Sequence, residues 1–245
     1  MNHSITLPTR RDEDFRYADL AALEQVWPVA VETIQVAAGE SGNLALVLDG
    51  AAPVAREIAI TLGDGASFDL RVLNAGSGYG RVAVRIELGR GASFTLGAAQ
   101  LAGGTQTVEI VTDVLHAQPD AVSRQIVRSV AGGQATANYL GKVRVAKGAD
   151  GTDGSQSVRA MLLDRTATAN AKPELEIFAD DVKCAHGCAV GELDANGLFY
   201  MAQRGLPPAE AKKLMLQAFV AEAFAGAADE ERLLEAALAA LGRLV

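Results

Sequence analysis

The chain has 245 residues, of which 49% are hydrophobic and 21% are charged, and its formal net charge is -8. This length allows a sizeable core, in one elongated domain with an appendage or in two small domains. Nucleic acid is an unsuitable main partner, because phosphates are neutralised by clustered Lys and Arg and the sequence has no such cluster. No apolar run approaches the roughly 20 residues of a membrane span, and the N-terminus lacks a secretory signal, so we expect a cytoplasmic protein without a membrane partner.

The first 30 residues form a short N-terminal segment of mixed charge. Its run "TRRDEDFRY" places Arg10, Arg11 and Arg16 near Tyr17. Such mixed charge is typical of a solvated helix face, and a binding patch is the alternative interpretation.

Residues 31–200 consist of short β-like runs separated by glycine turns. In "RVAVRIEL", residues 81–88, polar or small residues alternate with apolar ones, so one face of a strand is expected to be buried. "LGDGASFDL" from Leu62 returns as "LGRGASFTL" from Leu88, an offset of 88 - 62 = 26 residues. A repeat of strand and turn at this period indicates one coil of a β-solenoid, and two similar hairpin turns in a β-sandwich are the alternative.

The glycine-rich loop at residues 148–154, "GADGTDG", does not bind phosphate in the manner of a P-loop, because no Lys-Ser or Lys-Thr follows it. The sequence therefore predicts no ATPase activity of its own. Asp180 and Asp181 are adjacent and would point to opposite faces of a strand, so they do not flank one glycosidic bond. A polysaccharide-acting β-helix enzyme is accordingly a distant alternative.

Both cysteines of the chain lie in "KCAHGC", residues 183–188. On a strand, Cys184, His186 and Cys188 would project from one face together with Val182 and Val190. Cys and His are preferred ligands of zinc, iron and iron–sulfur clusters, but a tetrahedral site needs four ligands and this run offers three. Two interpretations stay open. Either the face is buried and the cysteines act as small hydrophobes, or the site is open on one side and completed by another subunit.

The last part of the chain is expected to be helical. Pro207 and Pro208 suit the start of one helix and Gly226 its end, and Asp229 is a plausible N-cap of a second helix. Two short amphipathic helices are not stable alone, so they pack on the β-domain or on a partner. The apolar residues expected to share a face are Ala211, Met215, Ala218 and Phe219 in the first helix and Leu234, Leu238, Leu241 and Val245 in the second.

Six segments carry a more specific signal than composition or periodicity: "LPTRRDEDFRYADL" (7–20), "HAQPDAVSRQIV" (116–127), "GKVRV" (141–145), "LLDRTATANAKPELEI" (162–177), "KPELEIFADDVKCAHG" (172–187) and "LFYMAQRGLPPAEAKKLM" (198–215). Together they resemble the SufB/SufD family of iron–sulfur cluster assembly proteins, and within it the SufD branch. The resemblance covers nearly the whole chain, with Phe15 where the family usually has tryptophan. The C-terminal signature is the most specific part.

The resemblance implies a mainly β chain: a right-handed parallel β-helix over residues 31–200, with an N-terminal segment at 1–30 and α-helices at 201–245. It also implies a non-catalytic scaffold subunit that pairs with SufB through the end of the β-helix. Cys184 and His186 match the family's interface Cys and His, with His186 the stronger candidate for cluster formation or iron entry, and the missing ligand would come from the other chain. Cys188 stands where family members usually have a small non-thiol residue, so it is either an added ligand or a buried thiol.

The family further implies that the C-terminal helices bind the ATPase SufC, which supplies the ATP hydrolysis. We expect no tightly bound cofactor in the isolated chain and a transient iron–sulfur cluster or iron at the SufB interface. Reduced flavin in the complex is a further option, and whether the chain binds metal or flavin without its partners stays open. Homodimerisation of the isolated chain stays open. A self-contained Cys/His metalloprotein or redox enzyme is the alternative, and it predicts stoichiometric metal in the chain alone. The residues expected to bind SufC are Arg204, Gly205, Leu206, Ala211, Met215 and Phe219.

Overall fold

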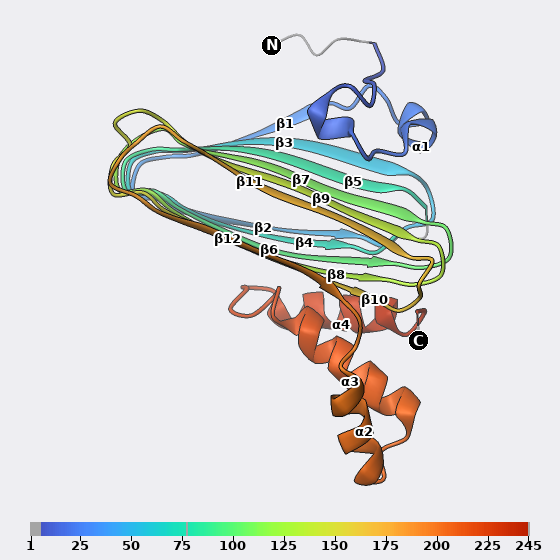
Figure 1. Ribbon diagram of the computed structural model, residues 1–245. Helices are drawn as coiled ribbons and strands as arrows, with labels where there is room; N and C mark the ends of the chain where they lie inside the picture. The colour runs from blue at the N-terminus through green and yellow to red at the C-terminus, as the bar shows by residue number, and fades with distance from the viewer. Residues whose placement is uncertain (1–5, 77, 245) are drawn as a thin grey trace.

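The computed structural model describes residues 6–244 except residue 77, and its centre is a parallel β-solenoid (Figure 1). The chain passes back and forth between two six-stranded sheets, one strand in each sheet per rung. The prediction of a mainly β solenoid with C-terminal helices is confirmed, and the β-sandwich alternative is wrong. In spatial order, one sheet contains β1 (Val31–Val36), β3 (Val54–Leu62), β5 (Gly80–Leu88), β7 (Thr107–His116), β9 (Thr136–Val145) and β11 (Thr168–Ile177). The other contains β12 (Lys183–Gly191), β10 (Asp153–Leu162), β8 (Val122–Ala131), β6 (Ser93–Ala102), β4 (Ser67–Asn74) and β2 (Ser41–Leu48).

The 26-residue repeat is one rung of the solenoid. Leu62 pairs with Leu88 in the first sheet, and Phe68 pairs with Phe94 in the second, so equivalent residues of the repeat lie directly above one another. The turns that join the two sheets require glycine at Gly65 and Gly91, whose φ angles are +66° and +62°. Each rung buries its apolar side chains against the next, which gives one continuous core between the sheets.

The alternation in residues 81–88 is confirmed except at one position. Val82, Val84 and Ile86 are buried in the core between the sheets. Arg81 belongs to the opposite, outward face, yet its side chain is only 3% exposed. The reason is that the N-terminal segment covers this part of the outer face, with the 3-10 helix η1 (Glu13–Phe15) and the short helix α1 (Leu20–Glu24).

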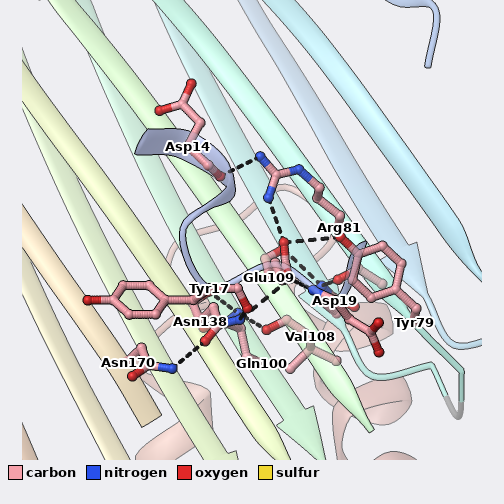
Figure 2. Close-up of polar contacts among 12 residues, drawn as sticks. Asp14, Tyr17, Asp19, Tyr79, Arg81, Gln100, Val108, Glu109, Asn138 and Asn170 are labelled. Carbon is pink, nitrogen blue, oxygen red and sulfur yellow. Dashed lines mark hydrogen bonds and ion pairs between the residues drawn. The ribbon is translucent and has the colours of Figure 1, made fainter. Parts of the chain in front are cut away.

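A buried ion pair fastens the N-terminal segment to the sheet (Figure 2). Arg81 Nη1 lies 2.5 Å from Glu109 Oε2, and both side chains are almost completely buried. Arg81 also donates to the carbonyl oxygen of Asp14 (2.8 Å), and Glu109 accepts from the backbone N–H of Asp19 (3.1 Å). Asn138 donates to the carbonyl oxygen of residue 17 (2.9 Å). The segment is therefore an irregular strap held through its backbone, not a helix face, although Arg10, Arg11 and Arg16 are exposed.

The C-terminal helices α2 (Ala195–Gln203), α3 (Pro208–Ala221) and α4 (Glu230–Leu241) follow the last strand, and α2 crosses residue 200, where we expected the helical part to begin. Much of α3 and α4 packs on the outer face of the second sheet, so these helices dock on the chain's own β-domain (Figure 1). Within the described residues, no helix has the length and apolar character needed to cross a bilayer.

The helices exist as predicted, but they turn partly different faces to the sheet. Ala218 is exposed, and Met215, Phe219, Leu234 and Leu238 are half-buried. Gly226 has φ +76° in the turn after α3, and Asp229 precedes α4 but makes no side-chain capping bond. Val245 lies outside the described residues. The residues that are fully buried are Ala211, Leu216 and Val220 in α3 and Leu233, Ala237, Ala240 and Leu241 in α4.

Candidate interface site at the open end of the solenoid

The Cys-x-His-x-Cys run lies in β12, the last strand of its sheet. Cys184, His186 and Cys188 are in register with Gly154, Gln156 and Val158 of β10, whose positions are all buried. The three side chains therefore continue the inward-facing rows of the core, but no further rung of the described chain covers them. Cys184 is half-buried, whereas His186 and Cys188 are exposed.

This placement decides part of what the sequence left open. The prediction that the three residues share one face is confirmed by the register of β12 on β10. The interpretation of Cys188 as a buried thiol is wrong, because the end of the solenoid leaves this residue exposed. Among the described residues, no three Cys, His, Asp or Glu side chains are grouped closely enough to hold a metal ion. Any cluster bound here needs ligands from outside this part of the chain.

Both cysteines are free thiols with raised pKa values. Burial raises the pKa of Cys184, the nearby Asp153 carboxylate raises it further, and a backbone hydrogen bond from Gly154 opposes both effects. Cys188 is exposed as a residue, but partial desolvation of its thiol raises its pKa, and its Sγ lies 3.9 Å from the carbonyl oxygen of Ala171 on β11. The thiols therefore keep their protons near neutral pH, and metal binding would release them.

A buried polar network, which the sequence analysis did not identify, lies behind His186. Gln156 donates to the Tyr139 hydroxyl (3.2 Å), and Tyr139 and Thr112 both donate to Gln125 Oε1 (3.2 and 2.9 Å). Gly141 makes room for this network, since a Cβ there would overlap the Tyr139 hydroxyl. The first rungs contain apolar side chains at the equivalent inward positions. Glutamine at inward-facing positions of residues 122–131 and 153–162 was the signal that could have revealed it.

Of the other two histidines, the structure describes His116. His116 is completely buried in the core, where its Nε2 lies 2.9 Å from Ser123 Oγ. Burial lowers the pKa of His116 to about 4. His3 lies outside the described residues.

The two edges of the last rung differ in what they offer another strand. The backbone N–H of Lys183 donates to the carbonyl oxygen of Thr152, on the side of β10. Successive residues of a strand direct their backbone N–H and C=O groups to opposite sides. The backbone groups of Cys184, His186 and Cys188 therefore point away from β10. At β11, the backbone N–H groups of residues 168 and 178 bond to the side of β9, so even-numbered residues direct their backbone groups to β9. The backbone of the odd-numbered residue 173 is therefore directed to the open edge. Residue 173 is proline, which has no N–H to donate. β12 is thus the edge better able to accept a new strand.

The residues expected to bind an ATPase differ in accessibility. Arg204 and Gly205 are exposed, and Leu206, Met215 and Phe219 are half-buried. Ala211 is completely buried, so it supports the helix and offers no surface to a partner.

Three apolar side chains of the helices, not selected from the sequence, are more exposed. The exposed fractions are 63% for Phe199, 56% for Tyr200 and 49% for Leu214. The Arg204 guanidinium stacks over the Tyr200 ring at 4.6 Å. "LFYMAQRG" contained the signal, because four consecutive apolar residues in a short helix cannot all face one neighbour and so leave an apolar contact surface.

Comparisons with known proteins agree with this architecture. The family model described as "SUF system FeS cluster assembly, SufBD core domain" matches residues 36–219. The iron–sulfur cluster assembly protein SufD of Escherichia coli K12 is 36% identical over 121 residues, which are 49% of this chain and 28% of that protein. SufD of Bacillus subtilis is 30% identical over 118 residues, covering 48% and 27%, and a SufBD family protein of Synechocystis is 34% identical over 125 residues, covering 51% and 28%. The matched segments span little more than a quarter of these curated relatives. Because the family model covers most of the solenoid and reaches into α3, the chain belongs to the SufB/SufD family of iron–sulfur cluster assembly proteins.

Proposed function

We propose that this chain is a SufD-like, non-catalytic scaffold subunit that pairs with SufB through the open end of the solenoid and with the ATPase SufC through its C-terminal helices. The observation that carries the proposal is the uncovered last rung, which presents His186 and Cys184 at a strand edge. The relatives named SufD are named as assembly proteins, which supports the scaffold role.

The open end suits a partner that also ends in a strand. The backbone N–H and C=O groups of Cys184, His186 and Cys188 point away from β10, and strand addition at this edge supplies affinity through the main chain. Exposed apolar side chains surround the same end: Phe178 is 68% exposed and Val190 47%. A partner strand on β12 would bury these groups and bring its own side chains next to His186.

The iron–sulfur cluster is the cargo of this interface. In our proposal the His186 imidazole and the Cys184 thiolate supply two ligands and SufB supplies the others. Cys188, which shares their face of β12, is an accessory ligand. The raised thiol pKa values mean that the isolated chain holds protonated, weakly nucleophilic cysteines. Ligation would therefore begin only when iron displaces the thiol proton at the assembled interface.

The C-terminal helices would bind the ATPase through α2 and the start of α3. Phe199, Tyr200 and Leu214 form the exposed apolar centre of this surface, and Arg204 stands beside it. Aromatic residues and arginine are enriched at the centres of protein interfaces. A cytoplasmic location and the involvement of reduced flavin stay predictions.

The test is co-expression with SufB and SufC from the same source, followed by size-exclusion chromatography with multi-angle scattering. Iron and sulfide are assayed in each peak for wild type, for His186→Ala and for the control Gln35→Ala, an exposed residue on the opposite edge strand β1. We expect a stable ternary peak whose cluster content falls with His186→Ala and not with the control. A chain that ignores both partners and carries stoichiometric metal alone would instead be a self-contained metalloprotein.

A further inference from the structure

Gln156 lies directly beneath His186 in one inward-facing row of the second sheet. The row consists of Leu96, Gln125, Gln156 and His186, which are in register on the neighbouring strands β6, β8, β10 and β12. Gln156 is 3% exposed, whereas His186 is exposed because no described rung follows it. Neighbouring strands lie about 4.8 Å apart, so the end of the Gln156 side chain is within reach of the His186 ring.

The buried network fixes which way the Gln156 amide points. A hydroxyl has one proton, and Tyr139 donates its proton to Gln125 Oε1 (3.2 Å). Toward Gln156 the Tyr139 oxygen can therefore only accept, and it accepts from Nε2 (3.2 Å). Thr112 does not take this place, because its own proton also goes to Gln125 Oε1 (2.9 Å). Gln156 is thus held with its amide nitrogen on Tyr139 and its amide oxygen turned away from it.

This amide oxygen has no hydrogen-bond partner among the described residues. Gln156 Oε1 is buried, and the Gln125 amide nitrogen, which is also without a partner, does not reach it. A buried acceptor without a donor is unfavourable, and native structures contain few of them. His186 is the next side chain in the row, and within the described chain it makes no hydrogen bond or ion pair of its own. It can supply the donor, because a neutral imidazole carries one N–H and one free nitrogen.

We propose that Gln156 is a positioning residue for His186: its amide oxygen accepts one ring N–H and leaves the other ring nitrogen free for iron. The inference rests on the proposed function, because the free nitrogen would bind the cargo metal. A hydrogen bond of this kind selects one tautomer and one ring orientation, and ligating histidines commonly have such a partner. Tyr139 acts one step further back, because it holds the Gln156 amide in the orientation that leaves the oxygen for His186.

The first measurement is ¹⁵N NMR of the isolated full chain, labelled only in its three histidines. It is made at about pH 8, more than one unit above the ordinary histidine pKa of about 6.5. The His186 signals are assigned by their loss in His186→Ala. In wild type we expect one ring nitrogen that carries the proton and one that does not, which is the spectrum of a single tautomer. In the near-isosteric Gln156→Met the two nitrogen shifts should move toward each other, as in an exposed histidine that exchanges between tautomers.

The matched control is Gln100→Met, which also removes a buried glutamine amide. The partners of this amide belong to a different cluster and are Val108, Asn138 and Ser129. The His186 spectrum of this variant should therefore equal that of wild type. A shift as large as in Gln156→Met would reflect general loosening of the core and would overturn the inference.

Tyr139→Phe is a second variant, because it keeps the ring and removes the hydroxyl that holds the Gln156 amide. The His186 shifts should move in the same direction as in Gln156→Met, and this variant decides the question if Gln156→Met does not fold. Unchanged His186 shifts in a folded Gln156→Met variant overturn the inference and leave the scaffold function intact.

The second measurement is anaerobic titration of the full chain in complex with SufB, with Fe²⁺ alone as the probe. We expect Gln156→Met to bind Fe²⁺ about 10- to 100-fold more weakly than wild type while SufB stays bound, the usual effect of removing the partner of a ligating histidine. Wild-type affinity in Gln156→Met overturns the positioning role and leaves the scaffold intact. If His186→Ala itself leaves Fe²⁺ binding unchanged, or if wild type does not bind SufB, the proposed function fails and the inference fails with it.

Discussion

His116 makes the stability of this chain depend on pH in a window where few other groups titrate. It is completely buried, and burial lowers its pKa from the ordinary 6.5 to about 4. The folded chain therefore keeps the imidazole neutral while the unfolded chain protonates it, so stability is fully present above about pH 6.5 and is lost as the pH falls toward about 4. The difference of about 2.5 between the pKa values, at 1.36 kcal/mol per whole unit, corresponds to about 3 kcal/mol in total.

About 2 kcal/mol of this amount should be lost between about pH 7.5 and about pH 5. The carboxylate of Glu222, whose pKa is lowered by its bonds to Arg128, loses its contribution mainly below its ordinary value of 4.5, outside this window. The assay is urea unfolding at both pH values for wild type and His116→Gln, which keeps a polar group near Ser123 but does not titrate. The variant should be less stable at the higher pH and nearly independent of pH across the window. An equal loss of stability in wild type and variant would refute the reasoning.

Three further predictions concern the strap, the helix contact and the open end. Arg81→Leu should cost about 3–5 kcal/mol in urea unfolding, because it leaves the Glu109 carboxylate buried without a counter-charge, and unchanged stability would contradict this. Gly97→Ala should destabilise the chain by about 1–3 kcal/mol, since a Cβ there overlaps a backbone carbonyl after α3, whereas Gly187→Ala, which meets nothing, should be near neutral in the same assay. In the isolated chain Cys188 should be alkylated at a rate that keeps rising with pH beyond the ordinary thiol value, because burial raises its pKa; a rate that levels off below that value would argue against it.

The fold was predictable wherever a pattern is repeated locally. The 26-residue repeat arises because stacked rungs place equivalent residues in register. The pairing of Leu62 with Leu88 shows this directly. The burial of Arg81 was not predictable in the same way. Alternation assigns Arg81 to the outer face, and the segment that covers it lies 67 residues away in sequence. The buried face of α3 escaped prediction for a related reason. Leu216 and Val220 are buried because of the shape of the sheet, which a helical stripe alone does not encode.

The candidate site was predictable in its chemistry but not in its exposure. A spacing of two on a strand is enough to align Cys184 with His186, and the register confirms it. Whether the face that carries Cys184 and His186 is buried depends on whether another rung follows. The flanking Val182 and Val190 do not decide this, because valines occur at such positions both in the last rung and in a middle one. The network behind His186 was missed because glutamine at an inward position is read from sequence as surface until the strand register is known.

Pro173 bears on how chains of this kind avoid forming fibres. A solenoid open at its last rung could in principle stack on the first rung of another copy and continue without limit, since both ends consist of unpaired strand edges. Such stacking would require the outward N–H of residue 173 in the first sheet, and proline has none to give. The imino acid therefore disfavours endless head-to-tail growth while leaving β12 free for a single, finite pairing.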